Sequence, residues 1–309
     1  MPTPMHLGTL PYTGCPLDRA AHRRKDPAWL AARLTDPATR FLAVWNDSNQ
    51  VTPAPEPVVL AGHEAGMALE MAEEVVFLGL WDGRAVFALD LSFLADDEVL
   101  AAAGERGAFR DLREVGPLLH GADAALLAYA RALLRWHRGH RFCGRCGHPT
   151  DATDGGHARV CRHAGCARSH FPRTDPAVIV LVHDGGEHCV LGRQARHPPG
   201  VRTTLAGYVE PGESPEEAVA REVHEEVGLA VAPESVRYLG AQPWPFPGQL
   251  MLGFHARAAF APLHVDTAEL ADAAWYTRGQ LTGDEGDGPV LPRRDSIARR
   301  LIAAWLAGS

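Results

Sequence analysis

Residues 207–229 read GYVEPGESPEEAVAREVHEEVGL, and this stretch decides the fold of the second half of the chain. Ser214, Pro215 and Glu217 form a typical helix start: serine caps the free amides, proline suits the first turn, and the acid completes a capping box. Gly228 marks the helix end, because glycine readily adopts the left-handed conformation found there. The stretch therefore predicts a loop followed by a helix of about three to four turns.

The predicted helix places acidic side chains close together. At about 100° per residue, Glu222, Glu225 and Glu226 fall within one arc, beside an arc of valines that we expect to be buried. These carboxylates repel one another, and hard divalent cations such as Mg²⁺ or Mn²⁺ would relieve the repulsion. Arg221 can orient a carboxylate, and Glu213 in the loop can hold Arg221. For the helix alone, a solvated acidic face would be the better interpretation.

The loop in front of the helix reverses that interpretation, because nine positions match the pattern G-x5-E-x7-R-E-U-x-E-E-x-G-U, where U is a bulky aliphatic residue. They are Gly207, Glu213, Arg221, Glu222, Val223, Glu225, Glu226, Gly228 and Leu229. This is the Nudix box, and the chain resembles the hydrolase family that carries it. The resemblance implies metal-dependent cleavage of a nucleoside diphosphate derivative, with Glu222 and Glu226 as principal ligands and Glu225 supporting them or acting as base.

A second motif bears on the substrate. Residues 241–251 read AQPWPFPGQLM and resemble the SQPWPFPxS motif of the NADH pyrophosphatase (NudC-like) subfamily. Three prolines stiffen this expected loop, so we expect Trp244 and Phe246 to stack on a base; a packed Pro-aromatic corner is the alternative. Ala241 and Gln249 replace the usual serines and remove their hydroxyl groups. The expected substrate residues here are Gln242, Pro243, Trp244, Pro245, Phe246, Pro247, Gly248 and Gln249.

The resemblance assigns further residues outside the two motifs. Ala206 would offer its carbonyl to a metal ion, and Glu269 would be another carboxylate ligand. The expected substrate contacts elsewhere are Phe171, Tyr208, Ala298 and Arg110. The basic residues that precede the box either meet a phosphate or belong to a solvated loop, and both interpretations stay open for Arg193, Arg196 and His197.

Four of the six cysteines are clustered. Cys143 and Cys146 form a C-x2-C pair, and after fourteen residues Cys161 and Cys166 form a C-x4-C pair. Two such turns can close a tetrahedral site, which predicts one structural Zn²⁺ per chain. Two disulfides are disfavoured in a cytosolic setting, and a redox C-x2-C would not explain the second pair. Residues 139–172 are too poor in apolar residues to fold without such a staple.

The remaining patterns predict an α+β multidomain chain. We expect an N-terminal α+β domain at 1–138, a zinc ribbon with four cysteine ligands at 139–172, and a Nudix α/β/α sandwich with a mixed sheet at 173–309. Helices are expected at 27–34, 123–136 and 295–306, and a hairpin at 75–93 turning at Asp82-Gly83. Strands are expected at 176–182, up to Gly192, and near 236–239 and 250–259. No internal repeat is visible.

Composition narrows the class of protein. The net charge of −8 without a long charged block argues against an extended grip on duplex nucleic acid. Lys25 is the only lysine, so phosphate contacts would come from arginine, backbone amides or metal ions. No run of 18 apolar residues and no signal-like N-terminus is present, so we expect no membrane association and a cytoplasmic location.

Together these features predict an enzyme that cuts NAD(H) into NMN(H) and AMP. The resemblance also implies removal of NAD caps from RNA 5′ ends, and a homodimer. The alternatives are a Nudix hydrolase of ADP-ribose, a diadenosine polyphosphate or coenzyme A, and a non-catalytic regulator whose zinc module binds nucleic acid. Preference among NADH, NAD⁺, NADPH and capped RNA stays open.

Overall fold

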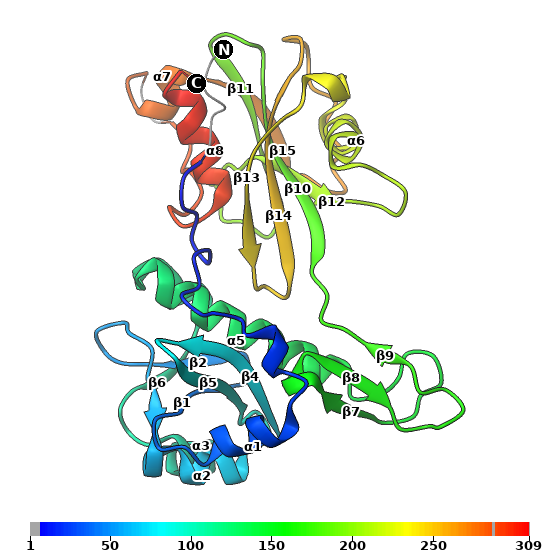
Figure 1. The fold of residues 1–309 in the computed structure, drawn as a ribbon. Coiled ribbons are helices and arrows are strands. Elements are labelled where there is room, and N and C mark those ends of the chain that lie inside the picture. Colours follow the sequence, from blue (N-terminus) through cyan, green and yellow to red (C-terminus); the bar gives the residue numbers. More distant parts are fainter. Residues whose placement is uncertain (1–6, 286–287, 309) are drawn as a thin grey trace. The chain divides into compact units, whose positions relative to one another are not determined.

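The computed structural model describes residues 7–285 and 288–308, which fold into two compact units (Figure 1). The N-terminal unit comprises Tyr12–Thr174 together with Pro245–Gly248. The C-terminal unit comprises Asp175–Trp244, the described residues from Gln249 on, and the described residues up to Pro11. Each unit thus joins segments that are distant in sequence.

The N-terminal unit is built on a mixed sheet. Its strand order is β4 (Glu74–Trp81), β5 (Arg84–Asp90), β1 (Arg40–Trp45), β2 (Ser48–Val51) and β6 (Ala108–Asp111), with β3 (Leu60–Ala61) also paired to β1. β1 and β5 are parallel, whereas the other pairs are antiparallel. The hairpin prediction is confirmed: Asp82 and Gly83 turn between β4 and β5 with φ values of 50° and 75°.

Helices complete this unit. They are η1 (Ala21–Arg23), α1 (Pro27–Leu34), η2 (Gly62–Ala65), α2 (Gly66–Met71), α3 (Asp96–Ala103), α4 (Leu112–Val115), η3 (Gly116–Leu118) and α5 (Gly121–Gly139). The helix expected at 27–34 is confirmed, and the one expected at 123–136 is longer at both ends. Side chains of η2, α2 and α3 share a hydrophobic core with Phe41, Phe77 and Phe87 of the sheet, while α5 contacts β1, β2, β4 and β5.

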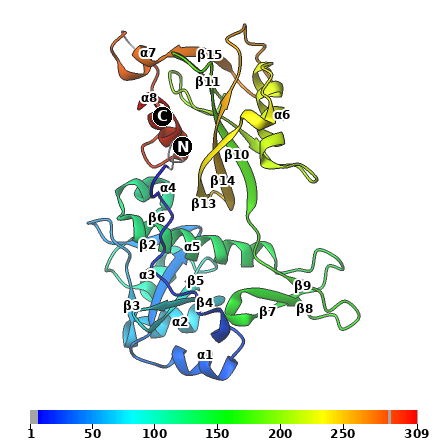
Figure 2. The same ribbon diagram turned by 45° about the horizontal axis from the view of Figure 1, so that its top comes forward.

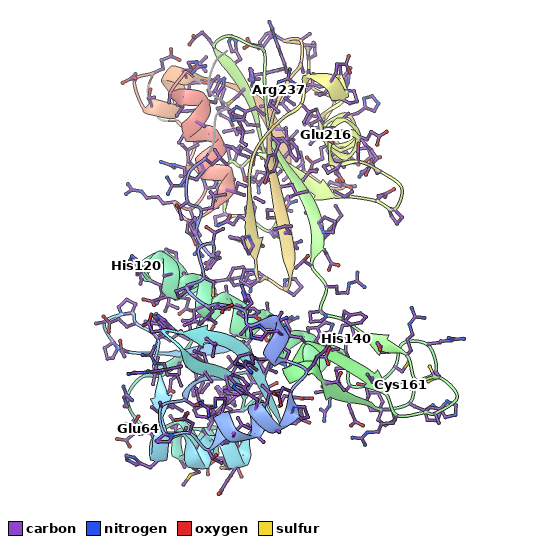
Figure 3. All side chains as sticks on the ribbon, in the orientation of Figure 1. Glu64, His120, His140, Cys161, Glu216 and Arg237 are labelled. Atoms are coloured by element: carbon purple, nitrogen blue, oxygen red, sulfur yellow. The ribbon has the colours of Figure 1, made fainter. Side chains whose placement is uncertain are left out.

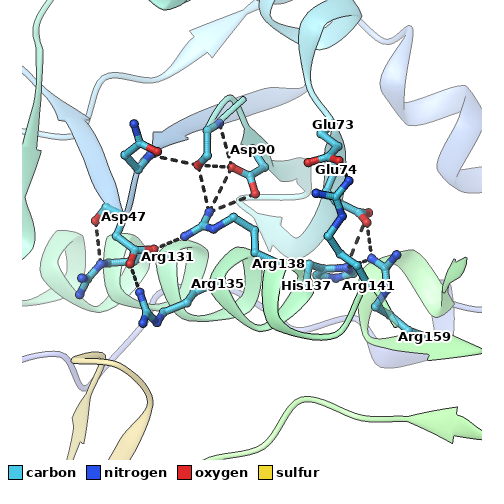
Figure 4. Close-up of polar contacts among 12 residues, drawn as sticks. Asp47, Glu73, Glu74, Asp90, Arg131, Arg135, His137, Arg138, Arg141 and Arg159 are labelled. Atoms are coloured by element: carbon cyan, nitrogen blue, oxygen red, sulfur yellow. Dashed lines mark hydrogen bonds and ion pairs between the residues drawn. The ribbon is translucent and has the colours of Figure 1, made fainter. Parts of the chain in front are cut away.

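Arginines of α5 clamp the turn between β1 and β2 (Figure 4). Asp47, in that turn, accepts hydrogen bonds from Arg135 and Arg138 through its carboxylate. Its carbonyl accepts a third from Arg131 Nε at 2.7 Å. Arg138 also donates to the fully buried carboxylate of Asp90, at 3.0 and 3.1 Å. One helix face therefore ties together the turn and the end of β5.

The cysteine-rich segment forms a small antiparallel sheet within the same unit. It consists of β7 (Thr150–Thr153), η4 (Asp154–Gly156), β8 (Ala158–Cys161) and β9 (Ser169–His170). Arg159 of β8 donates to Glu74 of β4, and His157 Nε2 lies 2.8 Å from the carbonyl oxygen of Phe77 (Figure 4 shows the arginine pair). Polar contacts therefore fasten this sheet to β4.

The C-terminal unit contains a second mixed sheet. Its order is β13 (Arg237–Trp244), β14 (Gln249–Arg257), β10 (Asp175–His183), β11 (His188–Arg193) and β15 (Asp272–Thr277), with β12 (Leu205–Tyr208) also paired to β10. Only β10 and β14 among these described pairs are parallel. The strands expected at 176–182 and up to Gly192 are confirmed as β10 and β11.

Helices cover both faces of this sheet, as the two views in Figure 1 and Figure 2 show. They are α6 (Pro215–Val227), η5 (Pro233–Ser235), α7 (Arg278–Thr282) and α8 (Ile297–Leu306). Alternate residues of β10 divide between the helices: Val178 and Val180 pack with α6, and Ile179 and Leu181 pack with α8. This arrangement confirms the α/β/α sandwich with a mixed sheet.

One expectation needs correction. Gln242, Pro243 and Trp244 belong to β13 rather than to a loop, because they pair with β14 in register as far as Trp244 opposite Gln249. The two sheets also form a topological repeat, since they have the same strand order and the same pairing directions. That repeat leaves no visible trace in the sequence, because strand order depends on distant contacts.

None of the helices within residues 7–285 and 288–308 combines the length and apolar character needed to span a bilayer.

Candidate active site

The loop and helix that follow β12 form as predicted. Ser214 Oγ accepts a hydrogen bond from the amide of Glu217 at 3.3 Å, and the Glu217 carboxylate accepts one from the amide of Ser214 at 2.8 Å. Pro215 opens the helix, and Gly228 closes it with a φ of 73°. The capping box and the glycine stop are therefore confirmed, and they fix where the carboxylates of α6 begin and end.

The buried side of α6 includes two glutamates besides its valines. Val219, Val223 and Val227 are fully buried, as expected. Glu222 and Glu226 are also buried, with only 8% and 1% of their surface exposed. Buried carboxylates are costly unless they are paired or bind a cation, so their placement needs a compensating partner.

A group of acidic side chains meets at this point. Oxygens of Glu222, Glu226 and Glu269 all lie within 4.8 Å of one another. Burial, reinforced by Glu222 and Glu269, raises the pKa of Glu226 to about 8, and burial likewise raises the pKa of Glu222. Glu226 Oε2 is buried and has no hydrogen-bond partner within the described residues. An all-oxygen set with an unsatisfied buried atom fits Mg²⁺ or Mn²⁺.

The end of β12 leaves just enough room for these carboxylates. A Cβ atom at Gly207 would stand 1.9 Å from the carboxyl carbon of Glu222, so any larger residue there would displace the Glu222 carboxylate. The backbone of Ala206 hydrogen-bonds the Glu226 carboxylate and opposes the rise in its pKa. The first position of the Nudix box therefore serves close approach of strand and helix.

Arg221 connects the loop to the helix. Its Nε and Nη2 atoms donate to the two carboxylate oxygens of Glu213 at 2.8 and 3.0 Å, a bidentate pair. Its Nη1 atom donates to Glu222 at 2.8 Å and to Glu225 at 2.9 Å, and Nη2 reaches the carbonyl of Tyr208 at 2.9 Å. Arg221 thus orients Glu222, whereas Glu225 is exposed and lies outside the acidic group of Glu222, Glu226 and Glu269.

Asp266 positions Glu269, a role that the sequence-based reasoning missed. The Asp266 amide donates to the carbonyl of Glu226 at 3.0 Å, which docks this segment on the end of α6. Its carboxylate accepts from the amide of Ala268 at 2.9 Å, and its carbonyl accepts from Glu269 at 3.2 Å and Leu270 at 2.9 Å. An aspartate side chain readily accepts a hydrogen bond from the backbone amide two residues on, so Asp266 could have been predicted as a turn residue.

A cavity of about 990 Å³ opens beside the acidic group, within the C-terminal unit. The expected substrate residues that line it are Tyr208, Gln242, Trp244, Gln249 and Ala298. Gln249 Nε2 donates to the hydroxyl of Tyr208. Gln242 is fully buried and bonds the carbonyl of Asp295 at 2.7 Å and the amide of Ile297 at 2.8 Å, so it holds the start of α8.

Other expected substrate residues belong to the N-terminal unit. Phe171 is 64% exposed, and Arg110 pairs with Glu114 at 3.3 Å. Pro245–Gly248 also fall in this unit. Within it, the ring of Phe246 is buried with the guanidinium groups of Arg113 and Arg131 at 4.6 and 4.7 Å from its centre. The expected substrate array is therefore divided between the two units.

The four clustered cysteines come together as expected from their spacing; Cys161 is marked in Figure 3. The Sγ atoms of Cys143 and Cys166 are 3.8 Å apart, and those of Cys146 and Cys161 are 3.4 Å apart, with no disulfide among them. These separations suit a zinc tetrahedron with Zn–S bonds of about 2.3 Å. The backbone amide of Arg145 lowers the pKa of Cys143 to about 6, which favours a thiolate ligand, although burial raises the pKa of Cys161 to about 12.

Family models match three consecutive parts of the chain. A model of the NADH pyrophosphatase-like rudimentary NUDIX domain matches residues 27–136, and one of the NADH pyrophosphatase zinc ribbon domain matches residues 138–171. A model of the NUDIX domain matches residues 173–294. The rudimentary domain and the NUDIX domain correspond to the two sheets with the same topology.

Similar proteins extend over nearly the whole chain. The "NAD-capped RNA hydrolase NudC" of Mycobacterium bovis (strain BCG / Pasteur 1173P2) is 40% identical over 307 residues, covering 94% of this chain and 92% of that protein. The protein of the same name from Stutzerimonas stutzeri (strain A1501) is 44% identical over 230 residues, covering 74% and 76%. The "NAD-capped RNA hydrolase NUDT12" of Macaca fascicularis is 34% identical over 343 residues, covering 94% and 72%. With this identity, this coverage and an intact box, the chain belongs to the NADH pyrophosphatase (NudC-like) subfamily of the Nudix hydrolases.

Proposed function

We propose that this protein hydrolyses the diphosphate of NAD(H) to NMN(H) and AMP, and that it removes NAD caps from RNA 5′ ends by cutting the same bond. The observation that carries the proposal is the group of buried Glu222, buried Glu226 and exposed Glu269 beside a cavity lined by Trp244. The names of the similar proteins point to capped RNA as one substrate.

Mg²⁺ or Mn²⁺ would be held by these carboxylates, with the Ala206 carbonyl and Glu225 as further proposed contacts. When bound, such a cation polarises a P–O bond and lowers the pKa of a water molecule. Arg221, fixed by Glu213, keeps Glu222 in place. Glu225 lies outside the group of Glu222, Glu226 and Glu269, and we propose that it takes a proton from the attacking water while Arg221 holds one of its oxygens.

We further propose that one Zn²⁺ per chain is held by the four clustered cysteines, with a purely structural role, since four protein ligands leave no open position. The domain boundaries 1–138, 139–172 and 173–309, a homodimer and a cytoplasmic location are part of the same proposal. Light scattering on the purified protein tests the dimer, and metal analysis tests the zinc content. For the substrate, Tyr208, Trp244, Gln249 and Ala298 are the proposed cavity contacts, and Phe171, Arg110 and residues 245–248 stay proposed substrate contacts.

The decisive experiment uses purified protein with Mn²⁺ and identifies products by mass spectrometry. NADH, NAD⁺, NADPH, ADP-ribose, a diadenosine polyphosphate, coenzyme A and NAD-capped RNA are tested in parallel. We expect NMN(H) and AMP from the free dinucleotides, and NMN with 5′-monophosphate RNA from capped RNA. Cleavage restricted to ADP-ribose, the diadenosine compound or coenzyme A would reassign the substrate, and binding of RNA without any cleavage would favour a non-catalytic regulator.

A further inference from the structure

The cavity is lined by five acidic residues and three arginines, and the arginines differ in whether they have an ion-pair partner. The acidic lining residues are Glu210, Glu222, Glu225, Glu226 and Glu269. Of the arginines that line the cavity, Arg221 is bound by glutamates and Arg293 is paired with Asp295 at 2.7 Å. Arg196 is exposed and makes no hydrogen bond or ion pair with any residue in the described ranges 7–285 and 288–308. Its guanidinium is therefore available to a ligand in the cavity.

Arg196 lies on a loop that is anchored at its base. Arg193 and Arg202, on either side of the loop, bind the two carboxylate oxygens of Asp272 at 3.0 and 2.9 Å. The backbones of Gly192 and Thr203 exchange hydrogen bonds of 2.9 and 2.8 Å. Because Arg193 is held in this ion pair, it is less available to a ligand than Arg196.

The rest of the loop is also fixed. The amide of Arg202 donates to the carbonyl of Val290 at 2.9 Å, and the amide of Val290 donates to Gly200 at 2.9 Å. Within the loop, the amide of His197 donates to Gln194 at 2.9 Å. His197 also lines the cavity, and its Nδ1 atom is buried without a hydrogen-bond partner in the described part of the chain. Arg196, a cation without an ion-pair partner in the described residues, and His197, with its unsatisfied Nδ1 atom, are therefore consecutive residues of one anchored loop.

We infer that Arg196 binds a phosphate group of the substrate. A guanidinium presents a fork of donors that matches phosphate oxygens, and no lysine other than Lys25 exists in this chain to take that part. In a cavity otherwise rich in carboxylates, a free arginine attracts the anionic end of a dinucleotide. This inference rests on the proposed function and adds a recognition residue outside the Nudix box and the QPWPFP array.

Two phosphates of the substrate have the required chemistry. One is the diphosphate that is cut, which NADH already carries. The other is an additional phosphate, namely the 2′-phosphate of NADPH or the first phosphodiester of a capped RNA. Comparing NADH with NADPH and capped RNA distinguishes binding of the diphosphate from binding of the additional phosphate.

The test compares Arg196→Ala and Arg196→Lys with Arg237→Ala, an exposed arginine at the start of β13 that does not line the cavity (Figure 3). We expect Arg196→Ala to lower kcat/KM roughly 10- to 100-fold, mainly through KM, with an unchanged melting temperature. Arg196→Lys should recover part of the loss, because it keeps the charge without the fork. An equal loss on NADH, NADPH and capped RNA identifies the diphosphate; a larger loss on the latter two identifies the additional phosphate.

Wild-type kinetics in Arg196→Ala on all three substrates, matching Arg237→Ala, would overturn the inference. If the wild-type protein cleaves none of them, the proposed function fails first. Calorimetric titration with inorganic pyrophosphate then tests the anion site by itself. Weaker binding by Arg196→Ala than by wild type supports the site, and equal binding overturns it.

Discussion

The two sheets of this chain share one topology but not one chemistry. In the N-terminal unit the order is β4-β5-β1-β2-β6, and in the C-terminal unit it is β13-β14-β10-β11-β15. Each central strand pairs antiparallel with the next strand and with a short third one (β3 or β12), and parallel with a later strand. The scaffold therefore does not determine whether a unit carries a site.

The difference lies in the segment that comes after the short third strand. After β12 comes α6, with 13 residues, two buried glutamates and the loop that holds Arg221. After β3 come η2 and α2, and α2 has six residues of which one, Glu70, is acidic. A short helix cannot present carboxylates over several turns. Within the described residues, the acidic group that could hold a metal ion therefore lies in the C-terminal unit, whereas the four-cysteine group lies in the N-terminal one.

Removal of zinc should destabilise the cysteine-rich sheet of the N-terminal unit and leave the C-terminal unit folded. Zn²⁺ binding to such sites contributes about 10–16 kcal/mol, which becomes folding free energy of the segment that it staples. We expect Cys161→Ser to lose zinc and to increase hydrogen exchange in β7, β8 and β9, with no change in α6. Cys189→Ser, at a buried cysteine of the C-terminal unit, is the matched control and should keep its zinc. Equal exchange in both variants would remove the structural role of the metal.

Glu226→Gln should have the opposite effect, abolishing chemistry without unfolding. Loss of a buried carboxylate from the acidic group is expected to lower kcat about 10²- to 10⁴-fold. Glu216→Gln, in the first turn of α6 and outside that group, should retain activity (Figure 3 labels Glu216). NADH turnover and melting curves check both variants. Full turnover by Glu226→Gln would refute the assignment of roles on the helix.

Asp90→Asn tests whether the hydrogen bonds from the arginines of α5 to Asp47 and Asp90 stabilise only the N-terminal unit. Asp90 is fully buried and bound by Arg138, so removing its charge leaves a donor poorly matched. We expect the free energy of unfolding to fall by about 1–3 kcal/mol, measured by urea titration, with unchanged affinity for Mn²⁺. Asp82→Asn, at the exposed hairpin turn, should be nearly neutral. A loss of Mn²⁺ affinity in Asp90→Asn would contradict the separation of the two units.

Local patterns predicted the parts of the fold that depend on local contacts. The helix α1, the Asp82-Gly83 turn and the capping box at Ser214 each depend on neighbours within a few residues, and each was confirmed. The strands β1, β2, β3 and β6 were not predicted. Their pairings, such as β1 with β5 across 40 and more residues, depend on long-range contacts that leave no periodic signal.

The candidate site divides in the same way. The contact between Glu213 and Arg221 was expected from spacing on one loop and helix, and the structure contains it. The surroundings of Phe246 were not foreseeable, because Arg113 and Arg131 come from segments more than 100 residues earlier. Residue type predicts what a side chain can bind, whereas burial depends on which distant residues reach it.

Each unit contains a largely buried histidine, and the two histidines can be compared by their pKa values and hydrogen bonds. Burial lowers the pKa of His157 in the N-terminal unit and of His255 in the C-terminal unit to about 4 in both cases. His157 Nε2 lies 2.8 Å from the Phe77 carbonyl, and His255 Nε2 lies 3.0 Å from the Leu301 carbonyl, so each neutral ring donates one hydrogen bond.

An unfolded histidine titrates near pH 6.5, so between about pH 6.5 and 4 the unfolded chain holds a proton that the folded chain lacks. Stability should therefore fall as the pH drops through this range, by at most about 1.4 kcal/mol per pH unit for each histidine, and should show no such effect above pH 7. Because both pKa values are about 4, the two histidines should contribute the same dependence of stability on pH. Glutamine keeps an N–H donor but does not titrate, so His255→Gln should flatten the pH dependence of hydrogen exchange in β14 and α8 alone, and His157→Gln that in β4 and β8 alone. If either variant retained the wild-type slope between pH 7 and 5, the neutral, carbonyl-bound state of that histidine would be wrong, and other titratable groups of its unit would have to cause the acid sensitivity.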